Sequence, residues 1–296
     1  MPDHPLRPPR TSWLTRAYRL TRFTLHLLWG TAVVASVYPW ISQTARLQLK
    51  QRWSRQLLGT LGVRLETLGD AIPPGAMLVA NHISWLDIFV INAARPVAFV
   101  SKAEVRGWPL IGWLSAKTDT IFLRRGSRGH AKIINEEIAA ILGRGDCAAV
   151  FPEGTTTDGS QLLHFHAALL QPAIEAGRPI VPVAVAYYSA DGRRTVAPAY
   201  AGETTMGECL AAIVAAPRIV ARLSVAPALA SRADGEAVHR RAIAEAARTS
   251  IALSLHLPTA AEPPAASTAP ETVAVAADAS PSGDCPTDSR NPGPAA

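Results

Sequence analysis

Short apolar runs alternate with helical stretches through the central part of the chain. We predict β-strands at residues 77–81, 97–102, 120–125, 147–153, 180–187 and 219–226. We predict helices between or after them at residues 84–94, 129–143, 162–176 and 235–256. Strands that alternate with helices are typical of an α/β fold, so we expect a mostly parallel sheet flanked by helices.

The stretch that precedes this pattern is apolar and bordered by arginines and lysines. Residues 23–43 hold no formally charged side chain and nearly match the roughly 20 residues of a bilayer-spanning helix. We expect Pro39 to end or kink that helix. Residues 41–61 place apolar side chains at helical spacing among bases, which is typical of a helix on an anionic membrane surface. Because bases flank the apolar segment on both sides, a spanning helix and one held in or on a single leaflet both stay open.

Composition changes after Leu257, where proline, alanine and acidic residues replace the large apolar ones. Such a segment cannot bury enough apolar surface to fold, so it is predicted to be disordered. We therefore divide the chain into a membrane-associating helical segment at residues 1–60, an α/β domain at 61–257 and a tail at 258–296. The tail carries −4, so the other residues carry +10, although the 296-residue chain carries +6. A basic body favours nucleic acid, anionic lipid or an acidic substrate as partner.

The sequence NHISWLD, residues 81–87, places a histidine and an aspartate together at the end of a predicted strand. In a structural interpretation, Ser84 is the N-cap of the next helix and Asp87 completes a capping box. In a functional interpretation, Asp87 accepts the Nδ1 proton of His82 and leaves Nε2 free to take a proton from a substrate hydroxyl. The pair would then be a general base without a protein nucleophile, and both interpretations stay open at this point.

Two further segments place polar residues at strand ends, where ligands of open α/β sheets bind. In FPEGTTTDG, residues 151–159, Glu153 and Gly154 are suited to hold a polar headgroup, and the same segment is also suited to an ordinary turn. In TIFLRR, Arg124 and Arg125 are suited to bind phosphate, and solvated surface is the alternative.

These three segments and the strand PIVPVAV together resemble the blocks of the glycerolipid acyltransferase family that includes 1-acyl-sn-glycerol-3-phosphate acyltransferase. NHISWLD resembles its His-x-x-x-x-Asp block, and TIFLRR its second block with Arg125 in the arginine place. FPEGT resembles the third block, and PIVPVAV the fourth with Pro182 in the proline place. The resemblance covers about residues 60–225. It implies an α/β sheet with a membrane-binding N-terminal helical part.

This resemblance also implies a reaction, in which His82 and Asp87 deprotonate a lysolipid hydroxyl that then attacks the thioester of acyl-ACP or acyl-CoA. The residues implied to bind the acceptor are Lys102, Arg124, Arg125, Glu153, Gly154, Thr155 and Thr156. Pro182 is implied to lie on the acyl-donor side or to be structural. The implied partners are membrane lipids and acyl carrier protein or CoA, and the implied location is the cytoplasmic face of the inner membrane.

No cofactor beyond the thioester co-substrate is implied, and nucleic acid is not an expected partner. His164 and His166 are the nearest approach to a metal-binding sequence, but nothing completes a ligand set, so we expect no metal.

The third block departs from the family pattern at one position. The family usually continues Glu-Gly-Thr-Arg-Ser, whereas here Thr156 stands in the place of the arginine. This form resembles the branch that acts on lyso-ornithine lipid, whose acceptor has no phosphate. We expect lysophosphatidic acid as the acceptor, giving phosphatidic acid, with lyso-ornithine lipid or another lysolipid as the alternative. A thioesterase and a non-catalytic membrane lipid-binding protein are further alternatives, although a pure binder has no need of the His82–Asp87 base.

Overall fold

The computed structural model describes residues 10–258 except 109, 124–127 and 234–235. Two helices and a short turn form the N-terminal part, which we call the helical hairpin: α1 (Trp13–Ser36), η1 (Tyr38–Trp40) and α2 (Gln43–Leu61). Serine side chains cap both helices, Ser12 at α1 and Ser42 at α2. Pro39 lies in η1, so the predicted end of the apolar helix near Pro39 is confirmed.

Strands and helices then alternate along the chain. The strands of the main sheet are β1 (Val63–Gly69), β2 (Met77–Ala80), β3 (Val97–Lys102), β4 (Ile121–Leu123), β5 (Cys147–Val150), β6 (Ile180–Ser189) and β7 (Ile219–Val225). The helices after the hairpin are α3 (Asp87–Ala94), η2 (Ala103–Gly107), α4 (Ile111–Lys117), α5 (Arg128–Gly143), η3 (Ala167–Leu170), α6 (Gln171–Glu175), α7 (Met206–Ala215) and α8 (Arg240–Leu255). A small second sheet pairs β8 (Arg232–Ala233) with β9 (Glu236–Ala237).

The main sheet is mixed but mostly parallel, with the strand order β1-β7-β6-β2-β5-β3-β4. Only β6 and β7 pair antiparallel among the described neighbours. Strands β2, β5 and β6 lie in the middle of the sheet and are almost wholly buried. Because β2 pairs parallel with both β5 and β6, the carboxyl ends of the three strands lie at the same edge of the sheet, where ligands of such folds bind.

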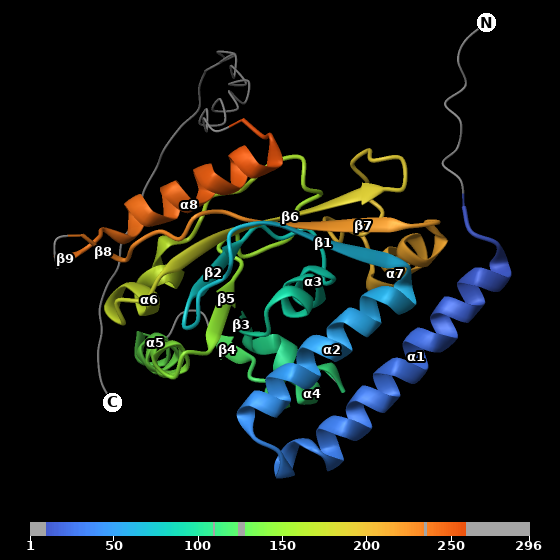
Figure 1. The fold of residues 1–296 in the computed structure, drawn as a ribbon, viewed down its shortest axis with the longest axis horizontal. Coiled ribbons are helices and arrows are strands. Elements are labelled where there is room, and N and C mark those ends of the chain that lie inside the picture. The colour runs from blue at the N-terminus through green and yellow to red at the C-terminus, as the bar shows by residue number, and fades with distance from the viewer. Residues whose placement is uncertain (1–9, 109, 124–127, 234–235, 259–296) are drawn as a thin grey trace, which may run out of the picture. The chain divides into compact units, whose positions relative to one another are not determined.

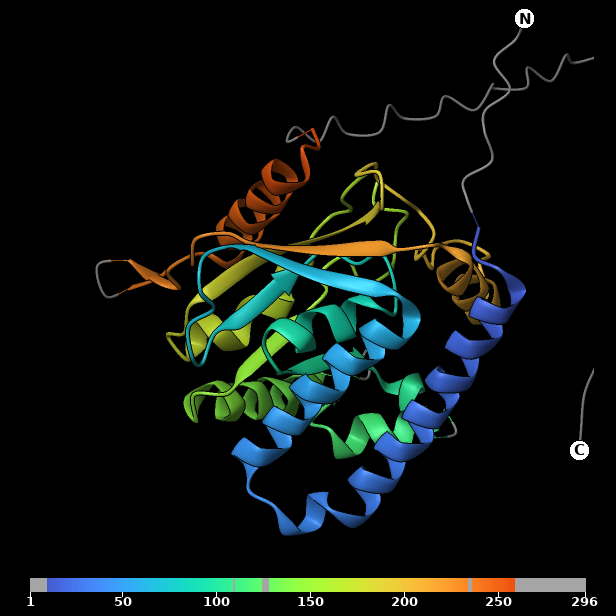
Figure 2. The same ribbon diagram turned by 45° about the vertical axis from the view of Figure 1, so that its right-hand side comes forward.

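Helices cover both faces of the sheet, and side chains of each strand alternate between two cores. In β2, Leu78 and Ala80 join α2, α3 and α7, whereas Met77 and Val79 join α5, α6 and α8. Figures 1 and 2 show α8 on one side of the sheet and α2 with α3 on the other, and α1 beside α2. This arrangement confirms the predicted α/β fold with a mostly parallel sheet flanked by helices.

Several predicted details differ from the structure. The helix predicted at 162–176 is wrong in its first part, because only residues 167–175 are helical. Backbone N–H groups of residues 163 and 166 instead bond to Glu153 and to the carbonyl of Pro152. Ser84 is not the N-cap of α3, which begins at Asp87 after Leu86. Strand β1 and helix α7 were not predicted from the sequence.

The predicted division at residues 60 and 257 stays a prediction. Helix α2 continues through the first boundary to Leu61 and buries Leu57, Leu58 and Leu61 in the core of the α/β fold. The tail after Pro258 lies outside the described residues.

Candidate active site

His82 and Asp87 meet at the junction between β2 and α3. Strand β2 ends at Ala80, and the six residues that follow form a loop before the helix begins at Asp87. The His82 Nδ1 atom lies 2.9 Å from Oδ2 of Asp87. A carboxylate only accepts hydrogen bonds, so Nδ1 carries the proton and Nε2 has the free lone pair. The structure therefore brings together the two side chains that the sequence paired.

The Asp87 carboxylate is fully buried and receives four hydrogen bonds. Its Oδ2 atom accepts from His82, from the backbone N–H of Ile83 at 2.7 Å and from that of Ser84 at 2.9 Å. Its Oδ1 atom accepts from the hydroxyl of Tyr187 at 2.6 Å. Four donors compensate the cost of burying the negative charge and fix the carboxylate in one orientation.

Tyr187 is a site residue that no sequence pattern indicated. It lies in β6, one hundred residues from Asp87 along the chain, and its side chain is buried. Burial and the adjacent Asp87 charge raise the pKa of Tyr187 well above its usual value. The hydroxyl therefore stays protonated and serves as a permanent donor to Asp87.

The His82 ring lies flat against Phe151, with 3.8 Å between the ring centroids and 9° between the planes. Phe99 stacks in turn on Phe151, with 5.6 Å between their ring centroids. About 18% of the His82 side chain is exposed. The imidazole is thus held at Nδ1 and on one face while part of it stays open to a substrate.

Glu153 connects the histidine loop with the loop that follows β5. Its Oε1 atom accepts from the backbone N–H of His82 and its Oε2 atom from that of Leu163, each at 2.9 Å. Burial raises the pKa of Glu153 above its usual value, and the two backbone bonds act in the opposite direction. Both carboxylate oxygens already accept backbone N–H groups, so Glu153 joins the two loops. Its predicted contact with substrate stays a prediction.

The remainder of the third block folds around His82. Gly154 has a φ of 71°, a left-handed conformation that favours glycine. The Thr156 hydroxyl donates to the carbonyl of Tyr200, whereas the Thr155 side chain is exposed. The Thr157 N–H donates to the carbonyl of His82 at 2.9 Å. A backbone hydrogen bond therefore connects this loop directly to His82.

Asn81 fixes the end of β2 against the neighbouring strand. Its side-chain amide donates to the carbonyl of Val185 at 3.0 Å, and its oxygen accepts from the N–H of the same residue at 2.7 Å. Asn81 is buried, so this pair of bonds replaces the strand pairing that ends at Ala80. The sequence block contains Asn81, but its partner in β6 is not visible from the sequence.

Other predicted site residues are not brought to His82 by any described contact. Arg124 and Arg125 lie outside the described residues, and for Lys102 only the backbone position in β3 is described. Pro182 is buried in β6 opposite Val79 of β2. His164 and His166 are exposed neighbours with ring centroids 5.8 Å apart. Within the described part of the chain, no group of three or more His, Cys, Asp or Glu residues is arranged to hold a metal ion.

We expect Glu153→Gln to weaken both loop contacts, because an amide has one accepting oxygen and its NH2 group would face the second N–H donor. A buried N–H left without a partner costs about 1–3 kcal/mol. The free energy of unfolding should fall by that amount, and any catalysis that depends on the His82 loop should fall with it. Chemical denaturation and initial rates measure the two effects. Glu175→Gln, at an exposed position in α6, is the matched control, and an equal loss in that variant would contradict the explanation.

Comparisons with known proteins agree with this fold. A family model described as Acyltransferase matches residues 64–186, which include His82, Asp87 and Glu153. The crystal structure of PlsC, a 1-acyl-sn-glycerophosphate acyltransferase from Thermotoga maritima, superposes with a TM-score of 0.61 at 18% identity. The superposition covers 82% of this chain and 94% of that chain, so the two proteins share a fold.

Curated relatives are closer in sequence. A lyso-ornithine lipid O-acyltransferase of Pseudomonas aeruginosa is 41% identical over 179 residues, which cover 57% of this chain and 69% of that protein. A 1-acyl-sn-glycerol-3-phosphate acyltransferase of Neisseria meningitidis is 39% identical over 171 residues, which cover 57% of this chain and 67% of that protein. Fold, family model and relatives together define an acyltransferase. The chain belongs to the glycerolipid acyltransferase family, as its four sequence blocks predicted.

Proposed function

We propose that this protein transfers a fatty acyl group from a thioester to the free hydroxyl of a lysolipid. The observation that supports this best is the His82 ring, which Asp87 holds by Nδ1 in a chain that belongs to an acyltransferase family. The pair supplies a base but no nucleophile of its own. A substrate hydroxyl is therefore the group that it activates.

In the proposed reaction, Nε2 of His82 takes the proton of the lysolipid hydroxyl as its oxygen attacks the thioester carbonyl. The imidazolium that forms is stabilised by the buried Asp87 carboxylate, 2.9 Å from Nδ1. The carbon–sulfur bond then breaks, the new ester is released, and the proton passes from Nε2 to the leaving thiolate. Acyl carrier protein or CoA carries this thiol, and both remain candidate donors.

Thiol release separates this proposal from a hydrolase. Purified protein is mixed with acyl-CoA or acyl-ACP, and free thiol is followed with and without lysolipid. A transferase releases thiol only when the acceptor is present, and mass spectrometry finds the matching diacyl lipid. Equal release without an acceptor would show a thioesterase and contradict the proposal.

Lysophosphatidic acid is the acceptor that we place first, with phosphatidic acid as the product, because the body of the protein is basic and this acceptor carries a phosphate monoester. Lyso-ornithine lipid is the second candidate. One observation favours it: the Thr156 hydroxyl is already bonded to the Tyr200 carbonyl and brings no positive charge to the third block. Competition between the two lysolipids in one reaction decides between them.

We expect Thr156→Arg to shift the acceptor preference toward lysophosphatidic acid. A hydrogen bond to a charged group is worth roughly 1.5–3 kcal/mol, which corresponds to about tenfold to a hundredfold in relative kcat/KM. The measurement is kcat/KM for each lysolipid in wild type and variant. Thr155→Arg adds the same charge at the adjacent exposed residue, so an equal shift in that variant would argue against a specific role of position 156.

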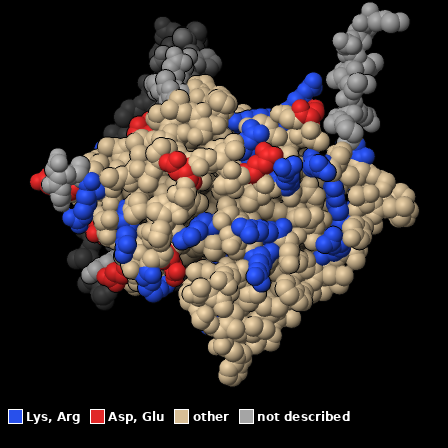
Figure 3. Space-filling model, viewed as in Figure 1, with Lys and Arg blue, Asp and Glu red and all other residues tan. Residues whose placement is uncertain are grey.

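We further propose that the helical hairpin binds the cytoplasmic face of the inner membrane. The segment Trp13–Trp40 is the one described helical segment whose length and hydropathy allow it to cross a bilayer. Large apolar side chains are exposed on it, namely Trp13, Leu14, Tyr18, Leu25, Leu28, Trp29 and Trp40. Figure 3 shows no charge over the η1 end of the hairpin, and Lys and Arg side chains gather above it. An apolar end bordered by bases suits an interface between acyl chains and anionic headgroups.

We expect Leu25→Ser combined with Leu28→Ser to weaken binding to lipid vesicles. These side chains are 59% and 57% exposed, and burying a leucine fully is worth roughly 1.5–3 kcal/mol. The pair should therefore lower partitioning at least about tenfold, measured by flotation with phosphatidylcholine vesicles. Val196→Ser with Leu253→Ser removes two exposed apolar side chains elsewhere and should leave partitioning near the wild-type value. Similar losses in both pairs would contradict this placement of the hairpin.

A further inference from the structure

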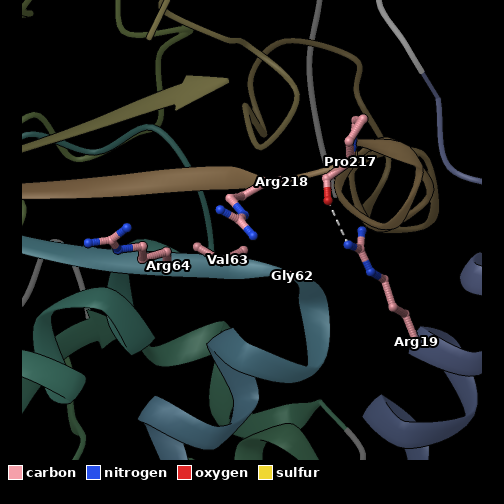
Figure 4. A pocket seen from close by; sticks show the side chains of 6 residues that line it. All are labelled: Arg19, Gly62, Val63, Arg64, Pro217 and Arg218. Atoms are coloured by element: carbon pink, nitrogen blue, oxygen red, sulfur yellow. Dashed lines mark hydrogen bonds between the residues drawn. The ribbon is translucent and has the colours of Figure 1, made fainter. Parts of the chain in front are cut away.

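A basic cavity lies beside the helical hairpin and contains neither His82 nor Asp87. Its volume is about 440 Å³, and it is lined by Arg19, Gly62, Val63, Arg64, Pro217 and Arg218. We call it the arginine pocket. Its walls come from α1, from the end of α2 and the start of β1, and from the turn that joins α7 to β7. Figure 4 shows Arg218 above Val63 and Gly62, with Arg19 reaching in from α1.

Arg19 is held firmly at the edge of this pocket. Its Nη1 atom donates to the carbonyls of Val214 and Ala216, at 3.1 and 2.6 Å, and its Nη2 atom donates to that of Pro217 at 2.8 Å. Gly62 makes room for this guanidinium, because a Cβ there would lie 2.4 Å from Nη2 of Arg19. These three bonds leave two of the five guanidinium N–H donors available to a ligand.

Arg64 and Arg218 supply two further positive charges on the same cavity. Both side chains are exposed, Arg64 in β1 and Arg218 directly before β7. Figure 4 shows the Arg64 guanidinium extended along β1 away from Arg218, so Arg64 would have to change rotamer to bind a ligand together with Arg218. The acidic neighbour of Arg64 is Glu66, whose Oε1 lies 4.0 Å from Nε of Arg64. Glu66 also pairs with Arg222 at 3.4 Å, so its single negative charge is shared. The pocket therefore keeps an excess of positive charge.

Three arginines line this one open cavity, which suits it to a phosphate oxyanion because arginine binds phosphate through paired N–H donors. The position of the pocket favours a lipid over a dissolved anion. Arg19 belongs to α1 and directly follows Tyr18, one of the exposed side chains of the helix proposed to contact the membrane. Basic pockets next to membrane-bound helices bind anionic headgroups.

We propose that the arginine pocket binds the phosphodiester headgroup of an anionic phospholipid, at a site separate from that of acyl transfer. This inference rests on the proposed membrane contact of the helical hairpin. It adds a selectivity for lipid charge to a surface that otherwise binds through apolar side chains. Full-length protein in solution is therefore expected to prefer vesicles that contain an anionic lipid.

The test compares flotation with vesicles of phosphatidylcholine alone and with vesicles in which part of the lipid is phosphatidylglycerol. The pocket variant is Arg64→Gln with Arg218→Gln, which leaves the bonded Arg19 in place. The control variant is Arg193→Gln with Arg241→Gln, two exposed arginines outside the pocket. Each arginine near an anionic surface contributes about fivefold to binding. The pocket variant should thus lose about twenty-five-fold of the preference for phosphatidylglycerol, and the control variant should keep most of it.

Inorganic phosphate separates a lipid site from a site for free anions. Added at constant ionic strength, it should displace wild-type protein from the anionic vesicles no more than chloride does. Specific displacement by phosphate would overturn the lipid assignment. An equal loss of preference in the control variant, or none in the pocket variant, would overturn the site itself. Acyl transfer by wild-type protein in detergent is measured separately, so its absence would count against the proposed function and not against the pocket.

Discussion

Replacing His82 by alanine is expected to lower the rate of acyl transfer by about 10²–10⁴, the usual contribution of a general base. The ring is the only part of the candidate pair with a nitrogen lone pair left for a substrate, because Asp87 takes the proton at Nδ1. Alanine removes that lone pair and leaves the four-donor environment of Asp87 short of one donor. The loss should appear in kcat rather than in the KM for lysolipid.

The control for this variant must separate chemistry from folding, since the ring also stacks on Phe151. Circular dichroism and the unfolding midpoint should show a folded protein. His239→Ala removes an exposed histidine that makes no side-chain capping bond at α8 and should keep full activity. A folded His82→Ala variant with more than about a tenth of wild-type activity, well short of the expected loss, would exclude His82 as the base.

Asp87→Asn is expected to lower kcat by about 10³ because it removes the negative charge beside the imidazolium while keeping the tautomer of His82. The N–H groups of Ile83 and Ser84 point at Oδ2, so the asparagine oxygen must take that place and its NH2 group must face Tyr187. The oxygen then still accepts from Nδ1 of His82, and the reactive tautomer is retained. What is lost is the negative charge beside the imidazolium, worth about 4 kcal/mol for a pair 4 Å apart at an effective dielectric constant of about 20.

Nitrogen-15 NMR of the imidazole tests directly whether the His82 tautomer is retained in Asp87→Asn. The variant should keep the proton on Nδ1 while its rate falls. A flipped tautomer would instead produce the larger loss, about 10⁴, known for triads in which the amide misorients the histidine. Asp70→Asn, at an exposed residue directly after β1, makes the same exchange away from the pair and should leave both tautomer and rate unchanged. A wild-type rate in Asp87→Asn would contradict a role for the charge.

The sequence indicated the parts of the fold and site that depend on local patterns. The buried strands β2, β5 and β6 stand out as short apolar runs, and His82 and Asp87 are close enough in the chain for one strand end and one helix start to join them. Strand β1 was missed because it is an exposed edge strand in which Arg64 and Glu66 alternate with apolar residues. Such alternation is the pattern of a half-buried strand, but here it is short and directly follows the predicted amphipathic helix, so it was not recognised as a separate element.

Contacts between distant parts of the chain could not be predicted in the same way. Tyr187 and Val185 reach Asp87 and Asn81 only because β6 pairs with β2, and no local pattern encodes that pairing. The helix predicted at 162–176 failed for a related reason. Leu163 satisfies its N–H with Glu153 across the loop, so tertiary bonds replaced the helical ones that its apolar spacing suggested.

The Asp87 carboxylate is bound from β6 as well as from its own loop, and this links the candidate pair to the centre of the sheet. Local opening of a protein is easiest where few buried contacts must break, and hardest in the central strands of its core. The hydroxyl of Tyr187 and the amide of Asn81 both lie in that hardest part. Heat should therefore inactivate the enzyme only as the sheet itself unfolds, with no earlier loosening of the site.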